Sequence, residues 1–294
     1  MNPGEPHESL ELLWARDPVV APRHPAEQAY GTALTFPGDR PLVFANFVQT
    51  IDGVVAFGAR GGWNASRISM DSEIDRRVMA LLRAHADAIV VGAGTFRIAH
   101  NHQWSPGGLV PGEAGSFDEL RAELRGPGAE RAPLYVLTAS GELDPRHAAL
   151  TAPETHVTVI STASGAARLE PLLPSHAELI ALGDGPAVDL AAAIRTTAER
   201  SGGLILCEGG PTLLGELARA GLLDQLFLTI APQLAGRDAD DRRLGLVEGF
   251  AASPEEAPRL ELHSLRRARQ HLFVRYDQPQ SSAAFRSASA PQRT

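Results

Sequence analysis

The chain has 294 residues, 44% of them hydrophobic, which is sufficient for one large domain or two small ones with a buried core. Its 27 basic and 35 acidic residues give a net charge of −8, which disfavours nucleic acids and membranes as partners because both require a basic surface. The single cysteine, Cys207, excludes intrachain disulfides. The sequence shows neither a leader-like segment nor an apolar run of about 20 residues, and we therefore expect a cytoplasmic protein.

The two ends of the sequence differ from its centre. Residues 1–40 are rich in proline, and we expect an arm that lies on the domain, with a short helix at Leu10 to Trp14. Residues 278–294 contain few large apolar side chains and are predicted to be disordered. The regular pattern lies between these ends, so we predict one domain over residues 41–277.

Strand and helix patterns alternate through this domain. The clearest helix covers residues 71–85, with Ser69 or Asp71 as its N-cap, and two more are predicted at 187–200 and 211–220. The predicted strands are residues 42–48, 88–92, 134–138, 156–161, 178–182, 204–207, 225–230, 259–265 and 271–276. The alternation predicts an α/β fold whose central, mainly parallel sheet is flanked by helices on both faces. The last two strands are too close for a crossover and should form a C-terminal antiparallel hairpin.

Two of the predicted strands end in glycine-rich turns. Residues 204–207 lead into Glu208, Gly209, Gly210 and Pro211, and proline is well suited to the first position of a helix. Residues 88–92 lead into a second glycine-rich turn that ends at Thr95. The free N–H groups of a helix start favour a bound anion such as a phosphate. A double glycine alone is also compatible with a tight turn that binds nothing.

Three segments together resemble a known family: residues 46–53, residues 82–95, and residues 208–214 with their continuation to 232. In this order and spacing they are similar to the pyrimidine reductase family of riboflavin biosynthesis, which has the dihydrofolate reductase-like fold. The resemblance covers roughly residues 42–276. It implies an NADPH-dependent oxidoreductase that transfers hydride to a small pyrimidine or pterin-like heterocycle.

The resemblance also implies which residues bind the cofactor. The strand-end turns would hold the pyrophosphate and the adjoining ribose, and residues 138–140 would meet the adenosine. The implied cofactor-binding residues are Gly92, Gly94, Thr95, Phe96, Thr138, Ser140, Gly209, Gly210, Pro211, Thr212 and Leu213. Arg97 is a candidate partner for a 2′-phosphate, and its spacing is equally compatible with a solvated surface arginine.

Asn46, Asp52 and Glu208 are the candidate catalytic residues, and Asn46, Trp63 and Glu208 are the candidate substrate-binding residues. Asp52 begins a segment that can fold over the ligands as a lid, or it is a turn residue that bonds to its own backbone. Trp63 is either a stacking ring or lid packing. Glu208 can accept hydrogen bonds from the N–H groups of a heterocycle, or it bonds to the backbone of the glycine turn.

The sequence departs from the family pattern at two places. Asn46 stands where the riboflavin enzymes usually carry a lysine, and residues 99–101 replace an Asp-Asp-Pro run that an arginine follows. These losses leave open a non-catalytic protein that binds a nicotinamide nucleotide, and a nucleotide-dependent transferase that shares only the glycine turns. Deamination is excluded because the H-x-E and P-C-x-x-C motifs are missing.

The remaining polar clusters predict no further site. His100 and His102 supply too few ligands for a metal, so we expect no metal centre. The arginines near the last hairpin, Arg266 and Arg275 among them, are interpreted as a solvated turn. By analogy with the family we expect a homodimer that pairs through the exposed hairpin at 259–276.

Overall fold

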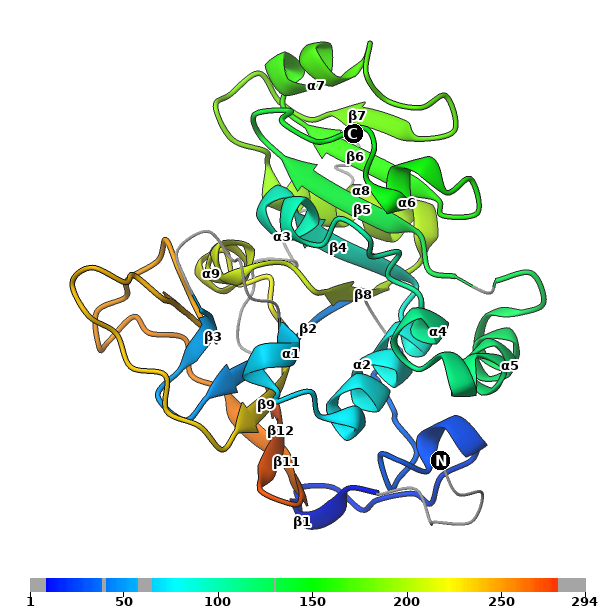
Figure 1. Cartoon of the computed structure of the whole chain (residues 1–294), viewed down its shortest axis with the longest axis vertical. Coiled ribbons are helices and arrows are strands. Elements are labelled where there is room, and N and C mark those ends of the chain that lie inside the picture. The colour runs from blue at the N-terminus through cyan, green and yellow to red at the C-terminus, as the bar shows by residue number, and fades with distance from the viewer. Residues whose placement is uncertain (1–8, 39–40, 58–64, 130, 280–294) are drawn as a thin grey trace, which may run out of the picture.

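The computed structural model describes residues 9–38, 41–57, 65–129 and 131–279. Its core is one ten-stranded sheet in the order β1-β11-β12-β9-β2-β8-β4-β5-β6-β7 (Figure 1). The parallel strands are β2 (Leu42–Thr50), β4 (Ala88–Gly92), β5 (Leu134–Thr138), β6 (Val157–Ser161), β7 (Glu178–Ala181), β8 (Leu204–Cys207) and β9 (Gln225–Ala231). Three antiparallel strands extend one edge: β12 (His271–Asp277), β11 (Glu261–Ala268) and β1 (Glu11–Ala15).

The order of the strands places an important junction at the centre of the sheet. The chain runs from β2 to β4 and outward to β7, and then returns so that β8 lies between β2 and β4. Ligands of open α/β sheets bind beyond the carboxyl ends of the strands at such a reversal of strand order. A small second sheet pairs β3 (Val54–Ala56) with β10 (Leu244–Gly245) just after β2.

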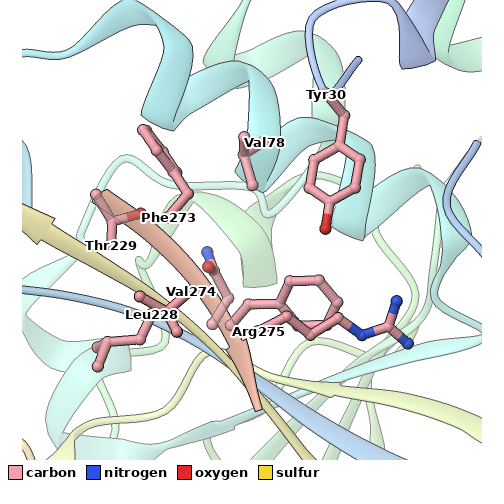
Figure 2. Close-up of a pocket in the computed structure, with 9 residues that line it drawn as sticks. Tyr30, Val78, Leu228, Thr229, Phe273, Val274 and Arg275 are labelled. Carbon is pink, nitrogen blue, oxygen red and sulfur yellow. The ribbon is translucent and has the colours of Figure 1, made fainter. Parts of the chain in front are cut away.

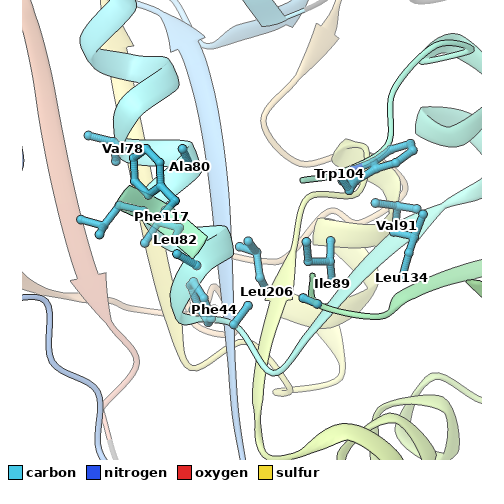
Figure 3. Packing of buried hydrophobic residues seen from close by; sticks show 14 of the residues in the cluster. Phe44, Val78, Ala80, Leu82, Ile89, Val91, Trp104, Phe117, Leu134 and Leu206 are labelled. Atoms are coloured by element: carbon cyan, nitrogen blue, oxygen red, sulfur yellow. The ribbon is translucent and has the colours of Figure 1, made fainter. Parts of the chain in front are cut away.

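Helices cover both faces of the sheet, because the buried strands are apolar on both sides. On one face, α2 (Glu73–His85) and α5 (Ala114–Arg125) pack on the core that contains Phe44 and Leu206 (Figure 3). On the other, α8 (Leu190–Ser201) and α9 (Pro211–Arg219) pack on the adjacent residues Val43 and Ile205. The shorter helices are α1 (Ala65–Ile68), α3 (Ala93–Ile98), α4 (Pro106–Leu109), α6 (Ala148–Thr151), α7 (Ala163–Leu169), η1 (Pro25–Glu27) and η2 (Pro111–Glu113).

The predicted fold class is confirmed, including the mainly parallel sheet and the C-terminal hairpin of β11 and β12. One helix cap differs from the prediction: Ser72, not Ser69 or Asp71, accepts the N–H of Asp75 at 3.3 Å. The reason is that Met70 and Asp71 have φ values of 56° and 55°, so the chain turns through the left-handed region just before the helix begins.

The N-terminal arm contains the largest error of the sequence prediction. Leu10 to Trp14 does not form a helix, and β1 instead pairs antiparallel with β11. An unpaired strand edge offers a row of backbone donors and acceptors, which outweighs a weak helical preference. The hairpin of β11 and β12 is therefore not the exposed edge that the sequence predicted.

The interpretation of the hairpin arginines as solvated is also wrong for two of them. Arg266 and Arg275 are each only 4% exposed, because the arm covers their face of the sheet.

Within the described residues no helix is both long and apolar enough to cross a membrane. The predicted disordered tail lies almost wholly outside the described residues.

Candidate active site

The carboxyl ends of β2, β4 and β8 meet at one edge of the sheet, because the three strands are parallel neighbours. The N–H of Glu208, directly after β8, donates to the carbonyl of Val90 in β4 at 3.1 Å. This bond ties the two strand ends together where their glycine turns begin. Both turns that the sequence singled out therefore lie side by side.

Each of these turns opens into a helix whose N-cap is a glycine. Gly92 caps α3 and Gly210 caps α9, and neither helix has a side-chain hydrogen bond at its cap. The backbone donors of the first turn of each helix are therefore free of a capping side chain. Gly94 and Thr212, in these first turns, are exposed. Two sets of backbone donors and two positive dipole ends thus lie at one place.

The glycines at these turns allow the close approach. A Cβ atom on Gly210 would lie 3.1 Å from the Thr95 Oγ1, and one on Gly209 would lie 2.5 Å from a methyl carbon of Leu213. Any larger residue at Gly209 would displace the buried side chain of Leu213, which is part of the first turn of α9. The residues present therefore fit the pyrophosphate of a dinucleotide, which needs backbone donors and room for close contact.

The turn after β5 lies one strand further from the centre of the sheet. Thr138 is 3% exposed, and its hydroxyl accepts the N–H of Gly141 at 3.1 Å, so its side chain shapes the turn. Ser140 is exposed, and its carbonyl accepts from Arg168. Arg97 donates to the carbonyl of Glu142 in the same turn at 3.3 Å. The predicted adenosine-binding residues and the candidate cation thus lie close together.

Phe96 does not suit the cofactor-binding role that the resemblance implied. Its side chain is fully buried and stacks on His147, with the ring centres 3.7 Å apart, and on Trp104 at 5.8 Å. The ring anchors α3 to the core, so only the backbone of Phe96 is left for a cofactor, and its cofactor-binding role stays a prediction. A residue's place in a motif fixes its backbone, but the local packing decides where its side chain lies.

Glu208 has an internal partner that the sequence did not reveal. Its two carboxylate oxygens accept from the Arg83 guanidinium at 2.6 to 3.1 Å, and the side chains are 2% and 7% exposed. His102 completes the cluster, with its Nε2 2.8 Å from the Arg83 Nη2. Burial and the neighbouring Arg83 lower the pKa of His102 to about 3, so the ring is neutral and Nε2 accepts from the guanidinium. Glu208 thus has a buried partner within the chain in place of the glycine-turn backbone, and its catalytic and substrate-binding roles stay predictions.

Asp52 braces a neighbouring loop. Its carboxylate accepts from the Thr50 hydroxyl at 2.6 Å and from the backbone N–H groups of Ala235 and Gly236 at 3.0 and 2.7 Å. These bonds, with the Thr50 hydroxyl foremost, hold the pKa of Asp52 well below its usual range. Asp52 is therefore an anion that shapes the chain after β2, which favours a turn role over a proton donor. Its catalytic role stays a prediction.

Asn46 lines a cavity on the α2 face of the sheet. The cavity is narrow, with about 10 Å³ of space, which is room for about one water molecule. Its walls come from α2, from three neighbouring strands and from the arm (Figure 2). The lining residues are Tyr30, Asn46, Val78, Phe227, Leu228, Thr229, Phe273, Val274 and Arg275. The substrate-binding and catalytic roles of Asn46 stay predictions, because the cavity as it stands is too small for a heterocycle.

A buried carboxyl beside this cavity was missed by the sequence analysis. Asp75 is 9% exposed and lies one helical turn before Val78 on α2, and the hydroxyls of Thr229 and Ser69 are within hydrogen-bonding reach. Its burial raises its pKa, although His271 opposes the shift. A signal was present in the sequence, because Asp75 occupies the apolar side of a helix that we predicted to be amphipathic.

The other candidates are quickly placed. Trp63 and the glycine-rich segment before it lie outside the described residues. Cys207 is fully buried, and burial raises the pKa of its thiol to about 12, so it is an inert core residue. Among the residues that the structure describes, no cluster of three or more potential ligands could hold a metal ion.

The sequence model of the RibD C-terminal domain matches residues 41–274 of this chain. Among curated proteins, the chain is 27% identical over 201 residues to the 2,5-diamino-6-ribosylamino-4(3H)-pyrimidinone 5′-phosphate reductase of Archaeoglobus fulgidus. That alignment covers 68% of this chain and 84% of the archaeal protein.

Solved structures share the fold. A pyrimidine reductase-like protein from Corynebacterium diphtheriae matches with a TM-score of 0.63 and 24% identity, over 87% of this chain and 98% of that one. The diaminohydroxyphosphoribosylaminopyrimidine deaminase/5-amino-6-(5-phosphoribosylamino)uracil reductase of Thermotoga maritima matches with a TM-score of 0.59 and 19% identity, over 82% of this chain. The match spans 57% of that longer protein.

Proposed function

This chain belongs to the family of the RibD C-terminal domain, and on that premise we propose that it is an NADPH-dependent reductase of a phosphorylated ribosylaminopyrimidine. Membership of this family makes it an oxidoreductase. The observation that carries the proposal is that two uncapped glycine turns and the buried carboxyl of Asp75 lie toward the same edge of one sheet. The turns suit the pyrophosphate of a dinucleotide, and the carboxyl suits the N–H groups of a small heterocycle.

The glycine turns would hold the cofactor. The backbone donors at the starts of α3 and α9 would bind its pyrophosphate, while residues 138–140 would contact the adenosine end. When bound, NADPH supplies a hydride from its nicotinamide ring. The protein's part is to fix the two ligands close together and to exclude water from the electron-deficient carbon that is reduced.

Asp75 is the residue that we assign to the heterocycle. The names of the two relatives describe substrates that differ at position 2 of the ring, which bears an amino group in the archaeal enzyme's substrate and an oxygen in the uracil. A 2-amino-4-oxopyrimidine presents two adjacent N–H donors, which match the two oxygens of a carboxylate. Uracil presents one N–H between two carbonyls, which repel a carboxylate. Asp75 therefore favours the amino substrate.

Asp75 would bind these two donors as a carboxylate, because a protonated carboxyl has one donor and one acceptor and would suit the uracil equally well. Burial raises the pKa of Asp75, so its carboxylate forms at higher pH than that of an ordinary aspartate, and binding of the amino substrate should strengthen as pH rises. The Thr229 hydroxyl fixes the orientation of the carboxylate. Asp52 is not suited to this part, because its oxygens are already bonded to the Thr50 hydroxyl and to the backbone.

The proposal is tested by following NADPH oxidation with the purified chain. The substrates are 2,5-diamino-6-ribosylamino-4(3H)-pyrimidinone 5′-phosphate, 5-amino-6-(5-phosphoribosylamino)uracil and dihydrofolate. We expect turnover of the first, with a kcat/KM at least about tenfold above that of the uracil, because the uracil loses one buried hydrogen bond. Binding of NADPH without oxidation of any of the three would instead indicate a nucleotide-binding protein without turnover.

We further propose that the chain acts in the cytoplasm as a homodimer. The described sheet has two edge strands, β1 and β7, and three large side chains of β1 are exposed: Leu12, Leu13 and Trp14 at 37%, 44% and 45%. Such an edge is suited to antiparallel pairing with a second copy. Sedimentation equilibrium should show a dimer for the unmodified chain and a monomer for Leu13→Lys. A monomeric unmodified chain would contradict the assignment.

A further inference from the structure

The carboxyl of Asp75 is held between α2 and two strands of the sheet. Asp75 lies in the first turn of α2, one turn before Val78, and its N–H donates to the Ser72 hydroxyl at 3.3 Å. Cross-strand partners share a face of a sheet, and Thr229 of β9 pairs with Phe273 of β12. Figure 2 shows Thr229 and Phe273 on neighbouring strands, on the side of the sheet where Val78 lies. The carboxyl reaches the Thr229 hydroxyl, so it lies over this pair.

His271 lies on the same face of the sheet, at the start of β12. Residues two apart in a strand share a face, and the centre of the His271 ring lies 6.5 Å from that of the Phe273 ring. On this face His271 is the diagonal neighbour of Thr229, and such neighbours are about 7–8 Å apart, within reach of a long side chain. The fold thus brings a histidine toward the buried carboxyl from a strand at the far end of the chain.

Ser69 links these two residues. Its carbonyl lies 3.0 Å from the Nε2 of His271, and its hydroxyl is within hydrogen-bonding reach of the Asp75 carboxyl. Met70 and Asp71 follow it with φ values of 56° and 55°, and this left-handed turn brings Ser69 back toward the first turn of α2. Ser69 is 2% exposed, so both contacts are made away from bulk water.

The contact with Ser69 fixes which nitrogen of the His271 ring carries a hydrogen. A carbonyl only accepts, so Nε2 is the nitrogen that donates to Ser69. In the neutral ring Nδ1 then has no hydrogen, and a proton can be added at Nδ1 while the bond to Ser69 is kept. His271 is partly exposed, so it can exchange this proton with solvent. The ring can therefore gain or lose a positive charge without moving.

Two cations favour the charged form of Asp75. Burial raises the pKa of Asp75, and the charges of His271 and of Arg76 on α2 oppose the shift. An arginine keeps its charge at every pH near neutrality, whereas a histidine changes its charge in this range. Further charged groups on the surrounding elements are either bonded elsewhere or exposed to solvent: Arg77 pairs with Glu73 and Glu113, Arg275 donates to Gln225, and Asp71 and Arg269 are exposed.

We propose that His271 is a positioning residue that sets the charge of Asp75, because its imidazolium form stabilises the carboxylate that binds the amino substrate. The pairing of the two side chains stands on the contacts above, whereas its consequence for the substrate rests on the proposed function. When the pair holds one proton, that proton resides on Nδ1 of His271, and the carboxylate is left free for the two N–H groups of the heterocycle. Without His271, Asp75 would hold the proton itself, and binding would require a higher pH.

The first test is the pH dependence of KM in NADPH oxidation with 2,5-diamino-6-ribosylamino-4(3H)-pyrimidinone 5′-phosphate. In the unmodified chain KM should fall as pH rises and the carboxylate forms. His271→Gln keeps a donor for the Ser69 carbonyl but cannot be charged, so it should move this fall to higher pH by about one pH unit and raise KM about tenfold on the acid side. His271→Lys keeps a positive charge and should restore the profile of the unmodified chain.

The second test needs no substrate. The ¹⁵N signals of the His271 ring are followed by NMR as pH is varied, and their loss in His271→Gln identifies them. Coupling between two titrating groups is reciprocal, so Asp75→Asn should lower the pH at which His271 takes up its proton by about one pH unit. In the unmodified chain the added proton should appear on Nδ1.

His263→Gln is the matched control. His263 also stands beside a carboxylate, with its Nδ1 2.8 Å from an oxygen of Asp277, but at the opposite end of the hairpin of β11 and β12. It should leave the KM profile and the titration of His271 unchanged. If the chain is active but His271→Gln follows the profile of His263→Gln, or if Asp75→Asn leaves the titration of His271 unchanged, the inference is overturned. If the unmodified chain oxidises NADPH with none of the substrates, the proposed function has failed, and the NMR titration alone decides whether the two side chains form a pair.

Discussion

Replacing Arg83 by methionine removes the partner of Glu208 and keeps a side chain of similar length. Arg83 and Glu208 are joined by three contacts of 2.6 to 3.1 Å, and their side chains are 2% and 7% exposed. Removing one member of a buried pair leaves the other charge without compensation, which costs about 3–5 kcal/mol. At about 2–4 °C per kcal/mol, Arg83→Met should lower the melting temperature by about 10 °C.

The decisive comparison is a double-mutant cycle. Glu208→Gln leaves Arg83 unpaired and should also be destabilised, whereas Arg83→Met with Glu208→Gln leaves no buried charge at the site. The double variant should therefore be more stable than the sum of the single effects predicts, by at least about 2 kcal/mol. The free energy of unfolding of all four proteins is measured in urea, with the slope required to stay constant. Additive effects would refute the assignment of a coupled, buried pair.

Asp75→Asn should lower kcat/KM about 100-fold, as expected for loss of charge-assisted hydrogen bonds to the two N–H groups of the substrate. Asp75→Asn should also stabilise the fold at neutral pH. The raised pKa of Asp75 means that the native state of the unmodified chain loses stability as pH rises above the ordinary range of a carboxyl. Thermal melts from acid to neutral pH should therefore show that the higher melting temperature of the variant disappears in acid. Asp52 has the opposite sign: its lowered pKa stabilises the fold above the ordinary range and that contribution is lost on acidification, so Asp52→Asn should differ from the unmodified chain at neutral pH but not in strong acid. Gly210→Ala should raise the Kd for NADPH about tenfold. Gly115→Ala, where a Cβ meets nothing within 4 Å, should leave the Kd unchanged. Equal Kd values for the two variants in a fluorescence titration would show that the turn at Gly210 does not bind the pyrophosphate. Arg97→Ala should weaken NADPH about tenfold and leave NADH unchanged, and an equal effect on the two nucleotides would remove Arg97 from the 2′-phosphate site.

The parallel sheet was predictable from sequence because its strands are short apolar runs that end in turn residues. The strand at residues 204–207 and the helix that begins at Pro211 were placed as the structure has them. The arm was not predictable in the same way. Residues 11–15 form a strand only because β11 presents an open edge to them, and the partner lies some 250 positions later in the chain.

The site shows the same division between backbone and side chains. Glycine and proline fix the backbone, so the two strand-end turns could be located before the fold was known. The partners of charged side chains are set by packing between distant segments, and this is why Glu208 was assigned to a ligand instead of Arg83. Asp75 was overlooked for a different reason: its place on the apolar side of α2 was visible in the sequence, but the pattern alone does not distinguish a buried acid from one at the margin of the helix face.

The central claim is that this chain transfers hydride from NADPH to a ribosylaminopyrimidine phosphate. The most direct measurement uses NADPH that carries deuterium at the transferable position of the nicotinamide, with 2,5-diamino-6-ribosylamino-4(3H)-pyrimidinone 5′-phosphate as the acceptor. Mass spectrometry of the product should show that each molecule has gained one deuterium, with an equal amount of NADP⁺ formed. A pyrimidine recovered without deuterium, or NADPH consumed without a labelled product, would contradict the account.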